Sequence, residues 1–211
     1  MMLSEKQAKE KIVFYAKSIF DRGLTSGASA NMSVKIDNGW VITPTNTCFG
    51  FLDVDSLSVV DKDGELVSGA KPSKEFLLHK RMYDKRPQDT CIIHLHSTWA
   101  TALSCLPAED ESNIVPTYTP YLTMRLGPIA RIPYFSPGDE KLADAISEVA
   151  ANHPGVIMAN HGPIVSAETV EKTVYGMEEL EESCKIAFIL MEKEATKLSR
   201  EQIDELFRRY R

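Results

Sequence analysis

Two apolar segments joined by a tight-turn sequence constrain the fold of this chain most. Apolar residues alternate with polar ones over 32–36, and a second apolar segment follows at 40–42, after Asp37-Asn38-Gly39. Alternation buries one face of a strand, and an Asn-Gly pair favours the two-residue turn of a β-hairpin. We therefore expect an antiparallel hairpin here. A capping-box signal at Ser4 and Gln7 predicts a helix before it, ending at Gly23.

The same two periodicities predict the other elements. Apolar residues at every third or fourth position favour helices, and short apolar runs bounded by turn residues favour strands. Six prolines within 107–140 favour loops in that stretch. The expected strands are 56–60, 65–67, 91–95, 129–133, 156–158 and 164–165, and the expected helices are 73–85, 97–106, 140–151, 168–191 and 199–210.

The order of these elements indicates the fold class. Sequential hairpins with helices on either side indicate an α/β sandwich whose sheet is mainly antiparallel. The chain has 211 residues and no shift in composition along its length. We therefore expect a single domain over 1–211.

The charge balance and the absence of long apolar runs narrow the classes of partner. The formal net charge is −6, whereas nonspecific nucleic-acid binding needs a surplus of Lys and Arg. No apolar run reaches the roughly 20 residues of a membrane span, and the N-terminal segment lacks the apolar core of a signal peptide. We expect no nucleic-acid partner, no membrane partner and a cytoplasmic protein. The four cysteines show no CxxC spacing and are expected to be buried, reduced thiols.

Three histidines form the strongest chemical signal. His94 and His96 lie two residues apart at a predicted strand end, so both side chains can face one object. Taken alone, the pair fits metal ligands and local hydrogen bonding equally well. His161 follows another predicted strand, in a Gly-Pro turn that could direct its imidazole inward. Three histidines with an open position describe a catalytic zinc site.

Glu75 lies in the early turns of the helix predicted over 73–85. It could serve as a fourth ligand or proton carrier, but a solvated first-turn glutamate favoured by the helix dipole is the better interpretation of its position alone. His79 lies one helical turn later and shares its face. It could support the metal ligands from behind, although packing or hydrogen bonding is the favoured role.

Small residues over 27–31 precede the first predicted strand. Such a loop could present backbone N–H groups to a phosphate, but it is not a P-loop, and a plain connector explains it better on pattern alone. Thr43 to Thr47, Ser73 and Lys74 could add hydroxyl and ammonium donors. Turn formation or helix capping would explain each of them equally.

Taken together, these segments resemble the class II aldolase and adducin head family over nearly the whole chain. The resemblance implies a three-layer sandwich with a central, mainly antiparallel sheet flanked by helices. It also implies a bound Zn²⁺, or another divalent metal, in a homo-oligomer that is commonly a tetramer. The motifs that carry it are Ala30-Asn31-Met32-Ser33-Val34, Ile42-Thr43-Pro44-Thr45, Pro72-Ser73-Lys74-Glu75, His94-Leu95-His96-Ser97 and Asn160-His161-Gly162.

The resemblance assigns roles to individual residues. The metal ligands would be His94, His96 and His161, with Glu75 as a ligand that also carries a proton. Ala30 and Asn46 depart from the aldolase pattern, because the family has a glycine at each of these positions. The residues implied in phosphate and substrate binding are Gly27, Asn31, Thr45, Asn46, Ser73 and Lys74.

A narrower resemblance is to the branch of 3-oxo-tetronate 4-phosphate decarboxylases. Its carriers include Thr119-Pro120-Tyr121, Met124-Arg125 and Pro137-Gly138-Asp139. It implies decarboxylation of a phosphorylated sugar acid to dihydroxyacetone phosphate and carbon dioxide through a metal-stabilised enediolate. Glu75 or Tyr121 could supply the proton, and Lys74 or Arg125 could orient the carboxylate or phosphate.

Three alternatives to decarboxylation stay open at this point. An aldolase acting on a sugar phosphate, such as L-fuculose 1-phosphate, would form the same enediolate by breaking a different bond. An epimerase or dehydratase of the family is a further candidate. A noncatalytic, adducin-like interaction domain would not keep the metal ligands as a set. Tyr210 is the candidate by position for a C-terminal tyrosine that reaches a neighbouring subunit's site, as in some relatives.

Overall fold

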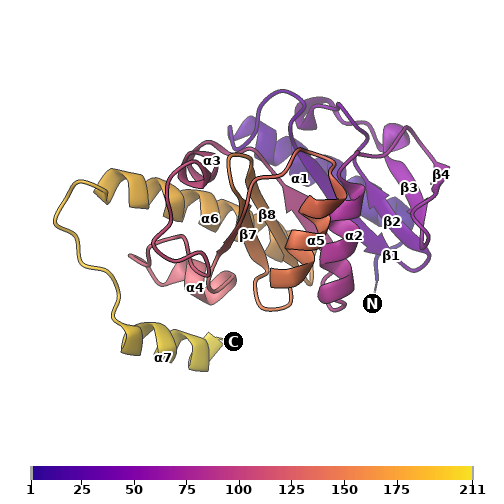
Figure 1. Cartoon of the computed structure of the whole chain (residues 1–211). Coiled ribbons are helices and arrows are strands. Elements are labelled where there is room, and N and C mark those ends of the chain that lie inside the picture. Colours follow the sequence, from indigo (N-terminus) through magenta and orange to yellow (C-terminus); the bar gives the residue numbers. More distant parts are fainter. Residues whose placement is uncertain (1, 211) are drawn as a thin grey trace.

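The computed structural model describes residues 2–210, which form an eight-stranded sheet with helices on both faces (Figure 1). The strand order is β4-β3-β2-β1-β5-β8-β7-β6. Every neighbouring pair is antiparallel except β6 with β7, which is parallel. The strands are β1 (Asn31–Ile36), β2 (Gly39–Ile42), β3 (Ser58–Asp61), β4 (Leu66–Ser68), β5 (Cys91–His94), β6 (Ala130–Ile132), β7 (Gly155–Met158) and β8 (Gly162–Ala167).

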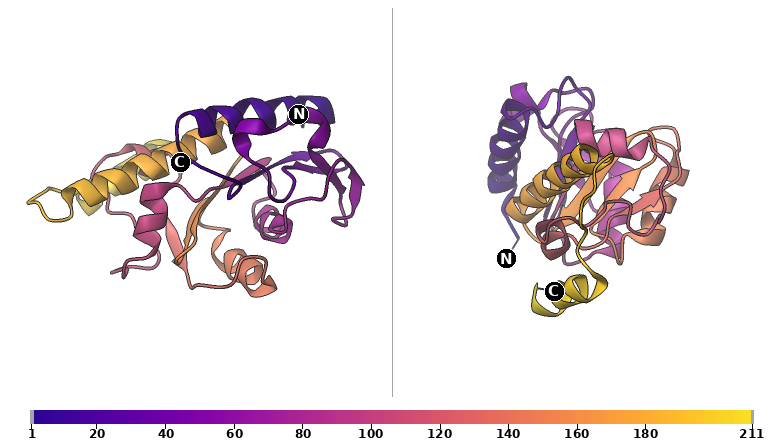
Figure 2. Two further views of the ribbon diagram at one scale, coloured as in Figure 1. Left: turned by 90° about the horizontal axis from the view of Figure 1, so that it is seen from above. Right: turned by 90° about the vertical axis from the view of Figure 1, so that its left-hand side faces the viewer.

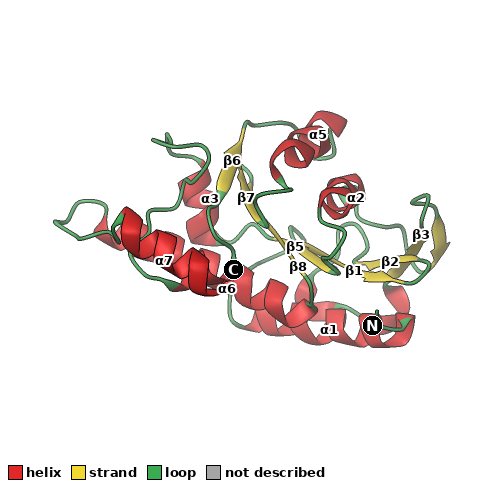
Figure 3. Cartoon of the chain, turned by 90° about the horizontal axis from the view of Figure 1, so that it is seen from below, coloured by secondary structure: helices red, strands yellow, loops and turns green. Residues whose placement is uncertain are grey.

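Helices cover the two faces of the sheet and make three layers. Figure 3 shows α2 and α5 on one face and α1 and α6 on the other, and Figure 2 shows α1 and α6 lying along the same side of the molecule. The predicted α/β sandwich with a mainly antiparallel sheet is thus confirmed. The helices are α1 (Glu5–Asp21), α2 (Phe76–Lys85), α3 (Thr98–Ser104), α4 (Tyr121–Arg125), α5 (Glu140–Val149), α6 (Val170–Leu190) and α7 (Arg200–Tyr210).

Each face of the sheet buries its own apolar cluster. The cluster under α1 and α6 includes Ile12, Val34 and Met177, and the cluster under α2 and α5 includes Met82 and Ile146. Strands buried on both faces need apolar residues in continuous runs, which is why β5 and β7 lack alternation. Among the cysteines, Cys91 and Cys184 are buried as expected, whereas Cys105 is exposed and Cys48 is half-buried.

The largest differences from the sequence prediction are the start of α2 and the presence of α4. Helix α2 begins at Phe76 instead of residue 73, and Glu75 occupies its N-cap position. The preceding residues are held to the segment that follows β2 instead, because Ser73 N–H donates to the carbonyl of Thr43 at 3.2 Å. Helix α4 was not predicted, since Pro120 immediately precedes it and prolines crowd the stretch.

Helix α7 lies apart from the sheet, beyond a stretch that leads away from the end of α6 (Figure 1). It contacts α4 and has no fully buried residue, although its sequence is amphipathic. Within residues 2–210, no helix combines the length and apolar character that crossing a membrane requires.

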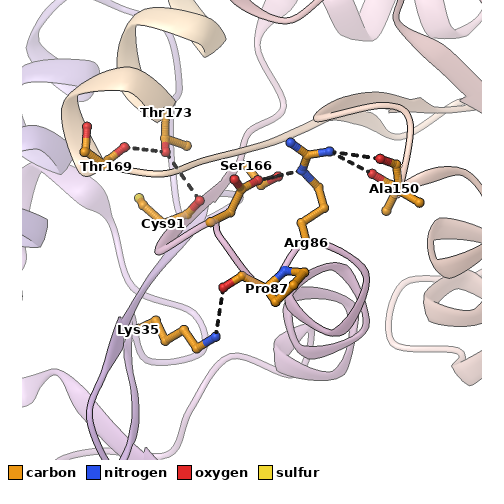
Figure 4. Close-up of polar contacts among 10 residues, drawn as sticks. Lys35, Arg86, Pro87, Cys91, Ala150, Ser166, Thr169 and Thr173 are labelled. Atoms are coloured by element: carbon orange, nitrogen blue, oxygen red, sulfur yellow. Dashed lines mark hydrogen bonds and ion pairs between the residues drawn. The ribbon is translucent and has the colours of Figure 1, made fainter. Parts of the chain in front are cut away.

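A buried ion pair joins α2 to β8 and to the end of α5 (Figure 4). Arg86 Nε lies 2.6 Å from Asp89 Oδ2, which also accepts a 2.6 Å hydrogen bond from Ser166 Oγ. The Arg86 guanidinium also donates to the carbonyl of Ala150 at 3.2 Å. The Asp89 side chain is only 1% exposed, so these partners, and not water, stabilise its negative charge.

We expect Arg86→Ala to lower the free energy of unfolding by about 3 kcal/mol, because it leaves the buried Asp89 carboxylate without its counter-charge. Arg81→Ala is a matched control on the same helix, since Arg81 pairs with Asp144 at 3.5 Å with both side chains well exposed. An exposed pair contributes at most about 1 kcal/mol. Urea denaturation of both variants measures the difference, and equal losses would contradict it.

Candidate metal and phosphate site

Three chain segments meet where β1, β5 and β8 come together. His94 is the last residue of β5 and pairs with Asn31 in β1 and Ile164 in β8. His161 lies in the turn between β7 and β8, where Asn160 has a left-handed φ of 54°. A Cβ at Gly162 would lie 2.5 Å from the carbonyl oxygen of Leu95, so only glycine lets this turn approach the end of β5. The turn therefore brings His161 to His94.

The three predicted histidines form a compact triangle. Each pair of ring centroids is 4.9 Å apart, and the ligand atoms all lie within 4.8 Å of one another. His94 Nδ1 lies 2.8 Å from the carbonyl oxygen of Pro163 and donates to it, which leaves the Nε2 lone pair of His94 facing the triangle. His96 lies two residues beyond His94, past the strand end, and is exposed. Nitrogen ligands on three sides with one side open fit a divalent metal such as zinc.

Glu75 closes the buried side of this triangle. Its Oε1 lies 3.5 Å from His161 Nε2, and its Oε2 lies 3.6 Å from His94 Nε2. The carboxylate is 7% exposed and accepts a 2.7 Å hydrogen bond from Asn31 Nδ2. Its position favours the ligand or proton-carrier interpretation over a solvated first-turn glutamate.

The environment keeps the histidines neutral and Glu75 ionised. Burial lowers the pKa of His94 to about 4, and burial also lowers the pKa values of His96 and His161. Burial alone would raise the pKa of Glu75, but His94, His161 and the Asn31 hydrogen bond outweigh it and lower that pKa. Neutral imidazoles and an anionic carboxylate are the forms that bind metal ions.

These shifts predict a pH-dependent stability for the metal-free protein. The folded-state pKa values of His79 and His94 are about 3 and about 4, below the ordinary value of 6.5. Between pH 6.5 and 4 the unfolded chain binds more protons than the folded chain, so stability present above pH 6.5 is lost as the pH falls. We expect the free energy of unfolding to fall by about 2 kcal/mol from pH 6 to pH 5. A profile that is flat over this range in urea denaturation would refute the expectation.

A pocket of about 230 Å³ opens beside the triangle. Lys74 is exposed at its edge, directly before the N-terminus of α2, where the helix dipole favours an anion. Asn46 has a φ of 57°, a left-handed conformation that asparagine tolerates better than most residues, which explains how it replaces a glycine. The predicted residues that line this pocket are Asn31, Thr45, Asn46, Ser73, Lys74, Glu75, His96 and His161.

Four predicted residues do not line this pocket, and one of them is the fully buried His94 of the triangle. Gly27 lies just before the lining residue Ala28, with a left-handed φ of 60°. Tyr121 is exposed on α4, and Arg125 at the end of that helix lies 5.7 Å from the ring of Tyr175 on α6. The prediction that Tyr121 is near the site is therefore not met within one chain. The reason is that α4 packs against α6, on the far side from α2.

Ser33 and Tyr83, which form hydrogen bonds behind the site, were not identified from the sequence, and Pro137 was named only as part of a resemblance. Pro137 lines the pocket. Ser33 is fully buried in β1 and contacts both His79 and Tyr83 on α2. The available sequence signal was the position of Ser33 two residues after Asn31, because alternate residues of a strand share a face.

The chain belongs to the family described as the Class II Aldolase and Adducin N-terminal domain, whose model matches residues 10–188. It is 42% identical over 203 residues to the 3-oxo-tetronate 4-phosphate decarboxylase of Escherichia coli (strain K12), covering 96% of each chain. It is 32% identical to the L-fuculose phosphate aldolase of Methanococcus vannielii, covering 82% of this chain and 91% of the relative. The crystal structure of YgbL from Escherichia coli superimposes with a TM-score of 0.93 at 41% identity, covering 96% of this chain and 98% of that one.

Proposed function

We propose that the chain is a metal-dependent carbon-carbon lyase that decarboxylates 3-oxo-tetronate 4-phosphate to dihydroxyacetone phosphate and carbon dioxide. The observation that carries the proposal is the histidine triangle with Glu75, set beside a pocket whose rim holds Lys74 and the N-terminus of α2. The near full-length similarity to curated decarboxylases supports this substrate class.

Binding of the metal falls to His94, His96 and His161, with Glu75 as a fourth ligand or a proton carrier. When bound, a divalent metal such as Zn²⁺ supplies a Lewis acid next to the oxygen on which negative charge develops. Glu75 is ionised, lines the pocket and lies within reach of the triangle, so in the proposed reaction it takes up a proton from water in the pocket and transfers it to the carbon that has lost the carboxylate.

Binding of the phosphate falls to the pocket residues that are not metal ligands. Lys74 forms no ion pair with any residue in 2–210, so its ammonium group is available to an anionic substrate. Thr45, Asn46 and Ser73 line the same pocket and supply hydroxyl and amide donors, and Gly27 gives the adjoining loop its turn. Phosphate held by these donors and reacting carbons held at the triangle would give the substrate one orientation.

The direct test is a product assay with purified protein, Zn²⁺ and 3-oxo-tetronate 4-phosphate. We expect carbon dioxide and dihydroxyacetone phosphate in equal amounts, and neither product after metal removal by a chelator. L-fuculose 1-phosphate is the comparison substrate, because the aldolase relatives make retro-aldol cleavage the second candidate function. Release of an aldehyde from it, with no carbon dioxide from the tetronate, would replace the decarboxylase assignment by the aldolase.

We further propose that the chain acts as a cytoplasmic, single-domain subunit of a homotetramer. Exposed aromatic side chains at Tyr121, Tyr134, Tyr175 and Tyr210 suit protein interfaces. In such an assembly, Tyr121 and Arg125 would act at the pocket of another copy instead of their own. Light scattering of the purified protein should give four times the mass of one chain, and a monomer would contradict the assembly.

A further inference from the structure

A ladder of buried polar side chains connects Glu75 to the interior of the protein. Asn31 and Ser33 lie on the same face of β1, and His79 and Tyr83 lie one turn apart on the facing side of α2. All four are at least nine-tenths buried, with His79 and Ser33 fully so. Buried polar groups are costly unless they are hydrogen-bonded, so the contacts among these four residues must be complementary.

Chemistry fixes the direction of every hydrogen bond in this ladder. His79 is fully buried and its two ring nitrogens contact only the uncharged Asn31 and Ser33 side chains, so its imidazole is neutral and has one donor and one acceptor. The Glu75 carboxylate can only accept, and Asn31 Nδ2 donates to it at 2.7 Å. Asn31 Oδ1 then faces His79 Nε2 at 2.5 Å, so Nε2 carries the proton and donates.

The far side of His79 completes the pattern. With its proton on Nε2, His79 accepts at Nδ1 from Ser33 Oγ at 2.8 Å. Because the Ser33 hydroxyl gives its one proton to His79, its 2.9 Å contact with the Tyr83 hydroxyl requires Tyr83 as the donor, and Tyr83 shares that proton with the Ser33 carbonyl oxygen at 3.1 Å. The contacts on this side are therefore compatible with the tautomer that the Asn31 contact requires.

We propose that His79 is a positioning residue that, through Asn31, holds the Glu75 carboxylate against the histidine triangle. This inference rests on the proposed role of Glu75 in the metal site. The Glu75 side chain makes no cap to α2, and the Asn31 amide is its one hydrogen-bond donor among residues 2–210. Without the His79 donor, the Asn31 amide can turn over and set its own oxygen against the carboxylate, which repels Glu75 from its place.

Two substitutions at His79 separate this role from simple packing. In His79→Gln the terminal amide reaches the position of Nε2 and keeps a donor for Asn31. In His79→Asn the shorter amide reaches the position of Nδ1, which keeps the contact with Ser33 but loses that donor. Tyr83→Phe removes a buried hydroxyl at the other end of the ladder and serves as a control for loss of stability alone.

The first readout is zinc affinity, measured by competition with a chelator and without substrate. We expect His79→Asn to weaken zinc binding about 10- to 100-fold, and His79→Gln and Tyr83→Phe to stay within about threefold of wild type. His79→Asn should also lower kcat by a similar factor with little change in KM. Equal affinities in His79→Asn and wild type, or equal losses in His79→Asn and His79→Gln, would overturn the proposal.

The second readout uses the wild-type protein and does not depend on the folding of any variant. In ¹⁵N-labelled protein, NMR should show His79 neutral with its proton on Nε2, and a proton on Nδ1 would overturn the proposal. If the wild-type chain binds zinc but releases no carbon dioxide, the proposed decarboxylase activity is refuted. The role of His79 is then still tested by the zinc affinities of the variants and by the His79 tautomer. A wild-type chain that binds no zinc overturns both.

Discussion

His94→Ala is expected to abolish stoichiometric metal binding and to lower kcat/KM by more than about 100-fold. Changes to groups that only support metal ligands already cost about 10- to 100-fold, and His94 is itself a ligand in the proposed site. Its imidazole is fully buried, is hydrogen-bonded to the carbonyl of Pro163 and forms one corner of the triangle. Metal analysis by mass spectrometry and steady-state kinetics measure the two losses.

The matched control for His94→Ala is His153→Ala. His153 lies before Pro154 in the loop between α5 and β7, outside the triangle, and contacts the carbonyl of Val149. It should keep metal and activity near wild-type values. If removing the buried His94 prevents folding, His96→Ala tests the same ligand set at an exposed position. Full metal content and full activity in both His94→Ala and His96→Ala would show that the triangle is not the metal site.

Glu75→Gln is expected to lower kcat by about 10²- to 10⁴-fold while the protein stays folded, because the amide has nearly the same shape but cannot carry the proton. Asn31 Nδ2 can still donate to the new side-chain oxygen, so the buried hydrogen bond survives. Metal affinity should fall less than in His94→Ala, since three histidines remain. Kinetics and metal content measured on one preparation separate these two effects.

Glu140→Gln is the control for the loss of a negative charge at a helix start. Glu140 lies in the first turn of α5 and is exposed, so its charge interacts mainly with water. Activity should not change in this variant. A Glu75→Gln protein with kcat within about threefold of wild type would remove Glu75 from the proposed proton transfer and leave it a structural residue.

The fold followed from the sequence wherever one local pattern was sufficient. The capping box at Ser4 and Gln7 begins α1, and a two-residue turn at Asp37-Asn38, between the paired residues Ile36 and Gly39, closes the β1–β2 hairpin. Helix α4 escaped prediction because five residues carry too little periodicity to outweigh a proline-rich setting. The start of α2 was misplaced because the segment before it bonds to the residues that follow β2, and such a tertiary contact leaves no local signal.

The metal-binding part of the site was predictable because its residue types are themselves typical metal ligands. His94, His96 and His161 are rare residue types at strand ends, and the structure brings all three together. The hydrogen bonds that hold Glu75 depend on the pairing of β1 with β5 and on the packing of α2 against the sheet. The sequence therefore predicted that His79 shares a helix face with Glu75, but it did not predict the hydrogen bond between His79 and Asn31. Arg125 and Tyr121 were named by resemblance alone, and the packing of α4 on α6 separates them from the pocket.

Returning metal to the metal-free protein in measured amounts tests most directly whether this site performs the proposed reaction. We expect carbon dioxide release from 3-oxo-tetronate 4-phosphate to rise in proportion to added Zn²⁺ and to reach its limit at one ion per chain, with no recovery in His94→Ala. Activity that survives metal removal, or that returns equally in His94→Ala, would contradict a catalytic metal held by His94, His96 and His161.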